Sequence, residues 1–204
     1  MSKVEFHVSA VSGIVAASLA ADSVLFACRV PPTDPNGYAN SKAARLKRVV
    51  AKWRTITGYT ASQEVSLAAH EVSAFGASPA DYTGGTDITP GIRRLGPDVG
   101  PNPQQATFFG AGNIRIATTA SLAHAGTPTV ATHPFAYDGA NELAAAATVA
   151  KGAFDMVFAP SDEGVDHCKG LLLYPTKGFI IRNPIALGAG GTGRLYVEMY
   201  WEES

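Results

Sequence analysis

Charged residues are scarce in this chain of 204 residues, which has 16 Lys and Arg, 17 Asp and Glu, and a charged fraction of 16%. Soluble domains usually carry about 25%. The formal net charge of −1 gives no long-range field that would collect nucleic acid or an anionic membrane, so neither partner is expected. So few charges suit a protein whose faces are covered by partner subunits, and an ordinary monomer remains open as the alternative.

Cysteines and long hydrophobic runs are scarce as well. Cys28 and Cys168 lie far apart and form no CxxC pair, so we expect no disulfide framework, and synthesis in reducing cytoplasm is the simplest interpretation. The uncharged stretch 7–21 is short, rich in Ser, Gly and Ala, and preceded by no basic segment. It therefore predicts neither a signal peptide nor a membrane span. By its length the chain should form one domain, residues 1–204, that needs no metal or disulfide to fold.

Strand signals are abundant instead. The clearest is the alternation in 194–202, where odd-numbered residues from Leu195 to Trp201 are apolar and even-numbered ones are polar or Tyr. Segment 49–57 also fits a helical stripe, but its β-branched residues favour a strand, with 64–75 as its partner strand. The other predicted strands are 4–9, 23–30, 114–118, 127–136, 153–159, 170–174 and 178–183.

About eight or nine strands with hardly any helix predict an all-β fold, an antiparallel β-sandwich of jelly-roll type. The Ala-rich segment 141–151 is either a short helix, capped by Asn141 and ended by Gly152, or an irregular crossover. Residues 1–21 are either an arm that reaches along a neighbouring subunit or the first strands of the sandwich. Residues 76–112 are rich in Gly and Pro and poor in large apolar groups, so we predict one long surface loop that contacts a partner.

A basic run precedes this loop. Six of the 16 basic residues fall within 42–54, and no carboxylate stands between Asp34 and Glu64. On a strand, Arg48, Lys52 and Arg54 would share one face, which is either a solvated face, an edge made repulsive to further pairing, or a contact for an acidic protein partner. Together with the loop, this run gives the partner-contact candidates Arg48, Lys52, Arg54, Asp87, Pro90, Arg93, Arg94, Pro97 and Pro101.

Catalytic and ligand-binding motifs are weak. Residues 188–193 match GxGxxG, but a strand rather than a helix follows them, so a hairpin loop between the last two strands is the better interpretation. Acceptor side chains gather between Asp162 and Cys168, including Asp166, with the spacing of neither an EF-hand nor a zinc site, and a solvated loop is expected there. The five His residues form no ligand spacing, and no GxSxG motif marks a nucleophile. We therefore expect no enzyme, no cofactor and no metal.

Three stretches resemble a family of small virion structural proteins of tailed bacteriophages. They are 45–75, in particular TGYTASQEV at 57–65 followed by GGT at 84–86; IRIATTA at 114–120; and the ending GFIIRNPIA at 178–186 through RLYVEMYWEE at 194–203. The resemblance covers about half the chain and carries no catalytic residue. It implies a β-sandwich that is made in the host cytoplasm and that decorates or cements the phage head shell of the virion, as a trimer bound to the major capsid protein.

Two other classes stay open. A structural protein of the tail, neck or fibre base shares the same build and differs in location and copy number. A carbohydrate-binding jelly roll would stack sugar rings on Trp53, Trp201 or Tyr200, but the alternation places both Trp residues in the core.

Overall fold

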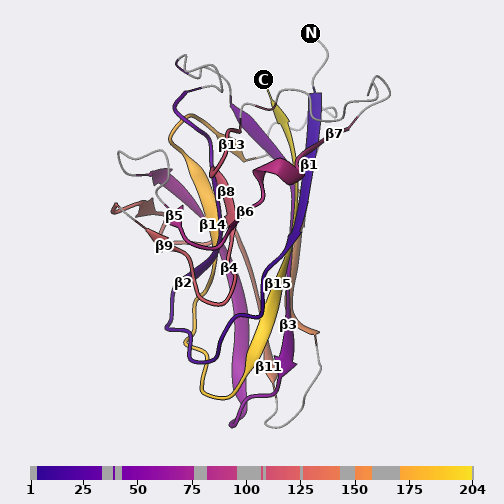
Figure 1. Cartoon of the computed structure of the whole chain (residues 1–204), viewed down its shortest axis with the longest axis vertical. Coiled ribbons are helices and arrows are strands. Elements are labelled where there is room, and N and C mark those ends of the chain that lie inside the picture. The colour runs from indigo at the N-terminus through magenta and orange to yellow at the C-terminus, as the bar shows by residue number, and fades with distance from the viewer. Residues whose placement is uncertain are drawn as a thin grey trace.

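The computed structural model describes residues 4–33, 39, 43–75, 82–95, 107, 109–124, 126–142, 150–157 and 171–203. In these ranges the regular structure is β-strand, apart from one short 3-10 helix, η1 (Thr89–Gly91). Two antiparallel sheets face each other, as Figure 1 shows, and the main cluster of buried apolar residues lies between them. The predicted all-β sandwich is therefore confirmed.

Eight strands of six residues or more form the body of the sandwich. They are β1 (Val4–Val11), β2 (Ser23–Arg29), β3 (Ala44–Thr57), β4 (Gln63–Ala74), β11 (Ala136–Glu142), β12 (Ala150–Val157), β14 (Gly178–Asn183) and β15 (Thr192–Glu203). One sheet, the outer sheet, has the order β12-β3-β15-β1, and the opposing sheet has the order β11-β4-β14-β2. If the eight long strands are renumbered 1 to 8 in chain order, the outer sheet has the order 6-3-8-1 and the opposing sheet the order 5-4-7-2. This is the strand order of a jelly roll.

Segments 49–57 and 64–75 were expected to pair with each other, and this expectation is wrong. The strands that contain them, β3 and β4, lie in different sheets, where β3 pairs with β12 and β15 while β4 pairs with β14 and β11. Alternation reports which residues are buried, but it does not identify the neighbouring strand.

The expectation of a hairpin loop at 188–193 is wrong for the same reason. The connection between β14 and β15 links the two sheets instead of forming a hairpin within one.

The expectation of one long surface loop at 76–112 is wrong for residues 82–95, which the structure describes. Residues 82–95 contain short strands and η1, and Tyr82 and Ile92 are buried. Apolar anchors and backbone pairing to β8 (Ile114–Ile116), β9 (Ala123–His124) and β1 give this segment a fixed path. The short strands are β5 (Tyr82–Thr83), β6 (Thr86–Asp87), β7 (Arg93–Leu95), β8 (Ile114–Ile116), β9 (Ala123–His124), β10 (Thr129–Val130) and β13 (Leu172–Leu173).

The N-terminal segment belongs to the sandwich. β1 lies between β15 and β7, pairs with β15 over its whole length, and buries Phe6 and Val8. Val15 and Leu19, which follow it, are buried as well. Of the two alternatives for residues 1–21, the structure therefore supports the first strands of the sandwich for 4–21. Of the segment 141–151, residues 143–149 lie outside the described residues; where the structure describes it, Asn141 lies within β11 and 150–151 begin β12, so Asn141 is not a helix cap.

The core forms between the inner faces of the two sheets. The apolar residues of β15 point inward as expected, and Trp201 is fully buried, with its ring centroid 5.6 Å from that of Phe6 and 5.4 Å from that of Phe109. Trp53 is also buried, near the C-terminal end of β3 in the same sheet. A Cβ on Gly193 would lie 2.3 Å from the Trp53 ring, so the glycine permits close packing there.

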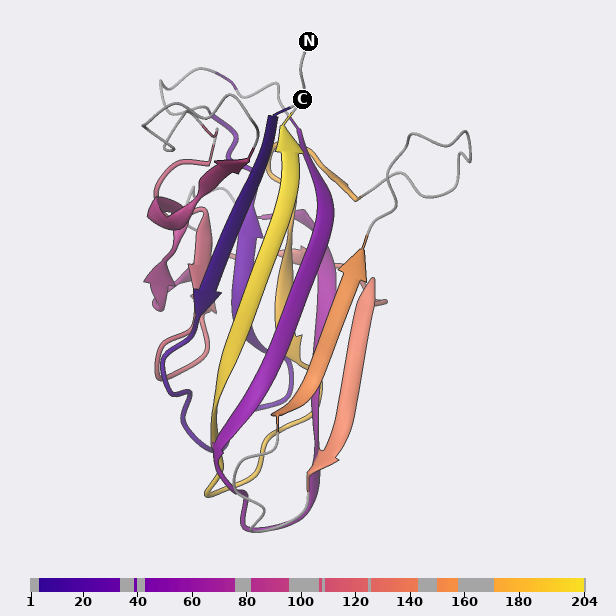
Figure 2. The same cartoon turned by 90° about the vertical axis from the view of Figure 1, so that its right-hand side faces the viewer.

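The two ends of the sandwich differ. β1 begins and β15 ends beside each other, and Figures 1 and 2 place both chain termini at this end. Because the strands alternate in direction, the strand ends that flank the longer connections 30–43, 75–135 and 158–177 lie at this terminal end. The shorter connections 12–22, 58–62, 143–149 and 184–191 join strands at the opposite end, called the far end below.

Candidate interaction surface

The outer face of the outer sheet carries most of the basic run. Figure 2 looks onto this sheet, with β1, β15, β3 and β12 side by side. Lys52 and Arg54 are exposed and Arg48 is half-exposed, so the structure places these three candidates on one face, away from the core. A register shift opposite Trp201 and Tyr200 leaves both Lys47 and Arg48 partly exposed, although they are neighbours in sequence.

Arg48 is neutralised within the chain. Its Nε donates a hydrogen bond of 2.7 Å to Oδ1 of Asp155 on β12, and its Nη2 pairs with Oδ2 of the same carboxylate. The hydrogen bond from Arg48 lowers the pKa of Asp155, and the same bond raises the pKa of Arg48. Arg48 is therefore less available to a partner than its place in the basic run indicates. Sequence reasoning missed Asp155, because the register of β12 against β3 leaves no signal in the sequence.

An aromatic cluster surrounds the same arginine. The ring centroids of His7 on β1 and Tyr200 on β15 lie 4.4 Å apart, and Arg48 stands over the Tyr200 ring at 6.0 Å. Burial lowers the pKa of His7, and the nearby Glu198 acts in the opposite direction. The side chain of Tyr200 is thus engaged by two neighbours, which leaves little of its ring for a sugar.

Lys47 and Glu202 form a second ion pair on the outer sheet, with the Lys47 Nζ 2.8 Å from a Glu202 carboxylate oxygen. Glu202 is only 6% exposed, so this pair covers a charge that would otherwise be buried without a partner. The basic run is therefore partly compensated near the terminal end. At the far end, Arg54 of β3 has no such compensation among the described residues, because it stands directly opposite another cation, Arg194 of β15. Sequence reasoning missed Arg194, because the two arginines are far apart in sequence and only the register brings them together.

The candidates in segment 82–95 have unequal roles. Asp87 holds the chain, because its two carboxylate oxygens accept hydrogen bonds from the backbone N–H of Thr89 at 3.0 Å and of Gly112 at 2.9 Å. Asp87 is thus a structural residue of this turn. Pro90 in η1 is exposed, and so is Arg93 beside His7 on the sheet, whereas Arg94 stands opposite the buried Phe6 and is partly buried. The candidates Pro97 and Pro101 lie outside the described residues.

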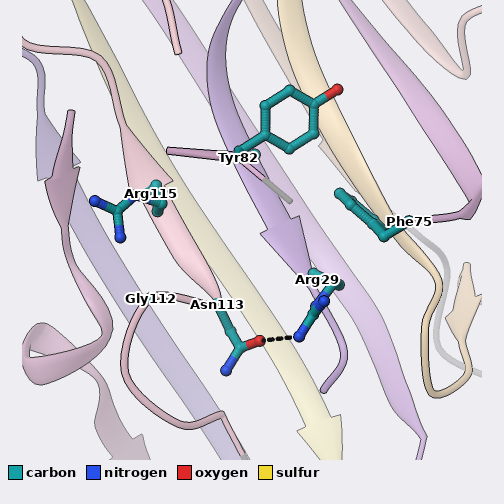
Figure 3. Close-up of a pocket in the computed structure, with 7 residues that line it drawn as sticks. Arg29, Phe75, Tyr82, Gly112, Asn113 and Arg115 are labelled. Carbon is teal, nitrogen blue, oxygen red and sulfur yellow. Dashed lines mark hydrogen bonds between the residues drawn. The ribbon is translucent and has the colours of Figure 1, made fainter. Parts of the chain in front are cut away.

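A small pocket lies outside the opposing sheet (Figure 3). Arg29 is 5% exposed there, and its Nη2 donates a hydrogen bond of 3.2 Å to Oδ1 of Asn113. The cavity measures about 10 Å³, which is room for about one water molecule. The pocket therefore offers no site for a substrate or cofactor. Its lining is Ala27, Arg29, Phe75, Tyr82, Gly112, Asn113 and Arg115.

Among the described residues, no three or more His, Cys, Asp or Glu side chains come together as metal ligands, and no helix is long and apolar enough to cross a membrane. The acidic cluster of Asp162 and Asp166 lies outside the described residues, as does Cys168. Cys28 is a free, buried thiol, and burial raises its pKa. Comparison with models of known protein families gives no match, and comparison with curated proteins gives none either.

Proposed function

We propose that this protein is a non-enzymatic structural protein of a tailed-phage virion, which decorates or cements the head shell as a homotrimer bound to the major capsid protein. The observation that carries the proposal is the jelly roll, with its two sheets in the orders β12-β3-β15-β1 and β11-β4-β14-β2. Jelly rolls are typical of viral capsid proteins, and they also serve lectins and cupins. The resemblance of 45–75, 114–120 and 178–203 to virion proteins favours the first of these classes.

The side chains also favour a scaffold over the other two classes. The aromatic residues that a lectin would need are engaged elsewhere, because Trp53 and Trp201 are buried and Tyr200 lies between His7 and Arg48. A ligand site inside the barrel would need space and polar groups there, whereas the inner faces here are filled by one apolar cluster. The feature of this chain that suits binding to partner subunits is its weakly charged surface, since only 16% of its residues are charged.

A cement protein can act through many weak contacts. Each copy covers a seam between shell subunits, and linking copies into an oligomer multiplies their effect through effective concentration. The terminal end of the sandwich suits such contacts, since the strand ends there flank the longer connections, and one of these connections presents the exposed Pro90 in η1 and the exposed Arg93 in β7.

Imaging of particles tests the proposal. Gold-labelled antibody against this protein should decorate the heads of purified particles from the source phage, and quantitative gel bands should give a hundred or more copies for each particle. Label restricted to one vertex or to the tail would assign the protein to the neck, tail or fibre base. Its absence from particles would overturn the virion role altogether.

The oligomer needs a separate measurement. Light scattering coupled to size-exclusion chromatography should give three times the mass of the 21.2 kDa chain. A monomer at all concentrations would contradict the trimer without bearing on the location in the particle.

A further inference from the structure

A cationic patch lies at the far end of the outer sheet, and it consists of Lys52, Arg54 and Arg194. Arg54 and Arg194 are a directly opposed pair across β3 and β15, and Lys52 is opposed by Tyr196 in the next outward-facing row. Side chains of such pairs share a face and have Cβ atoms about 4.5–5.5 Å apart. The three cations therefore form one cluster and not three isolated charges.

The described part of the protein leaves the two arginines of the patch without an ion-pair partner, whereas Lys52 is attracted by the nearby Asp155 carboxylate. In the part of the chain that the structure describes, neither Arg54 nor Arg194 makes an ion pair, and the Nε of Arg194 is buried without a hydrogen-bond partner. On the same sheet, the carboxylates of Asp155 and Glu202 are bound to Arg48 and Lys47. The exposed Glu198 stands opposite Val50, displaced along β15 from Arg194 toward Arg48 and His7.

This arrangement works against folding. Like charges directly opposite each other destabilise a sheet, and a buried N–H without a partner adds to the cost. An anion placed between the two arginines would remove both penalties.

Apolar side chains border the patch. Val11 on β1 stands opposite Tyr196 on β15, and its side chain is 47% exposed. Ile14, which follows β1, is 43% exposed, and Ile56 on β3 is 36% exposed. All three belong to the exposed large apolar residues among the described ones, and they lie near the cations: Val11 through its register, Ile14 next to Val15, which bridges Gly193, and Ile56 two residues after Arg54. The surface thus offers cations in its centre and apolar contacts at its rim.

We infer that this patch binds an acidic, partly apolar segment of a protein partner, whose carboxylates pair with Arg54 and Arg194 and whose apolar side chains contact Val11, Ile14 and Ile56. Guanidinium groups suit carboxylates because they donate two parallel hydrogen bonds. Nucleic acid fits less well, because three cations neutralise few phosphates and the flanking surface is aliphatic instead of a row of stacking platforms. On the proposed function, the segment would belong to a shell subunit.

The test uses the purified full chain and a fluorescein-labelled peptide of about 15 residues that alternates Glu or Asp with Leu. Fluorescence anisotropy at low salt should show saturable binding, which weakens as salt is added because the contacts are exposed. The double variant Arg54→Glu with Arg194→Glu should weaken binding at least tenfold. Lys177→Glu is the matched control, since it reverses a cation near the terminal end, beside Tyr174, and should leave the affinity within twofold.

A stability measurement separates lost binding from lost folding. Arg54→Gln keeps a polar, unbranched side chain on an exposed position and removes one of the opposed charges, so its melting temperature should equal or exceed that of the unchanged protein while peptide binding weakens several-fold. Equal affinity of the double variant and Lys177→Glu would overturn the inference, as would tighter binding of a single-stranded oligonucleotide of similar charge than of the peptide. Because purified protein is used, absence of the protein from particles would refute the proposed function and leave this result standing.

Discussion

Replacing Phe6 by Ala gives the sharpest test of where the N-terminal segment belongs. Phe6 is 3% exposed and stacks on Trp201 with ring centroids 5.6 Å apart and planes 18° from parallel. A buried Phe removes roughly 150–250 Å² from water, which at about 25 cal/mol per Å² gives about 4–6 kcal/mol as an upper bound. Measured Phe→Ala costs in cores are about 3–5 kcal/mol, and we expect this range for Phe6→Ala.

Urea unfolding followed by tryptophan fluorescence measures this loss. For a chain of this size the denaturant slope is about 2–3 kcal/mol per M, so the midpoint of Phe6→Ala should fall by about 1–2.5 M. The control is Val11→Ala on the same strand, where the side chain is 47% exposed and the cost should stay within about 0.5 kcal/mol.

A loss of stability that depends on protein concentration would instead show that β1 acts as an arm on a neighbouring subunit. If Phe6 packed against a neighbouring subunit, the loss would depend on protein concentration, because dissociation and unfolding would be linked. Unfolding at two concentrations that differ a hundredfold therefore accompanies the measurement. A loss below about 1 kcal/mol for Phe6→Ala at both concentrations would refute the packing described for this strand.

Three further predictions concern the interior and the acid side of the stability curve. Gly178→Ala should cost about 2–3 kcal/mol or more in urea unfolding, because its Cβ would lie 1.9 Å from the backbone carbonyl oxygen of Cys28, whereas Gly91→Ala has room and should be neutral or stabilising. Burial lowers the pKa of His70, so the unfolded chain takes up more protons and stability should fall as the pH drops below 6.5; melts on both sides of that pH should show a smaller drop for His70→Gln. Asp155 has a pKa lowered by the hydrogen bond from its arginine partner, so its contribution should be lost as the pH falls below 3.8, and Asp155→Asn should flatten that part of the curve.

Strand positions could be predicted from the sequence wherever one face of a strand is buried and the other is not. The alternation from Leu195 to Trp201 predicts both the strand and its inward face, and the burial of these residues agrees. The same local rule predicts Trp53 in the core and a loop at 188–193. One expectation failed for a local reason: the Gly and Pro of 82–95 conceal two buried apolar anchors, Tyr82 and Ile92. The capping rules at the ends of 141–151 were also misleading, because Asn141 belongs to β11 and 150–151 to β12.

The candidate site was predictable only in part. The run from 42 to 54 identifies Lys52 and Arg54 as exposed cations, because charge and strand period are properties of one segment. Their significance depends on partners that are distant in the chain. Asp155 neutralises Arg48 across β12, and Arg194 faces Arg54 across β15, so that two basic residues of the same run end in opposite environments.

The sequence by itself determined that this protein is an all-β sandwich with a weakly charged surface and an apolar core that includes both Trp residues. It could do so because burial and strand period are set by neighbouring residues along one strand. Only the tertiary structure decided which strands are neighbours, that 4–21 belong to the sandwich, and that Arg54 and Arg194 share one patch. Those outcomes depend on the register between segments that are up to about two hundred residues apart, and a one-residue slip would turn every side chain of a strand to the other face.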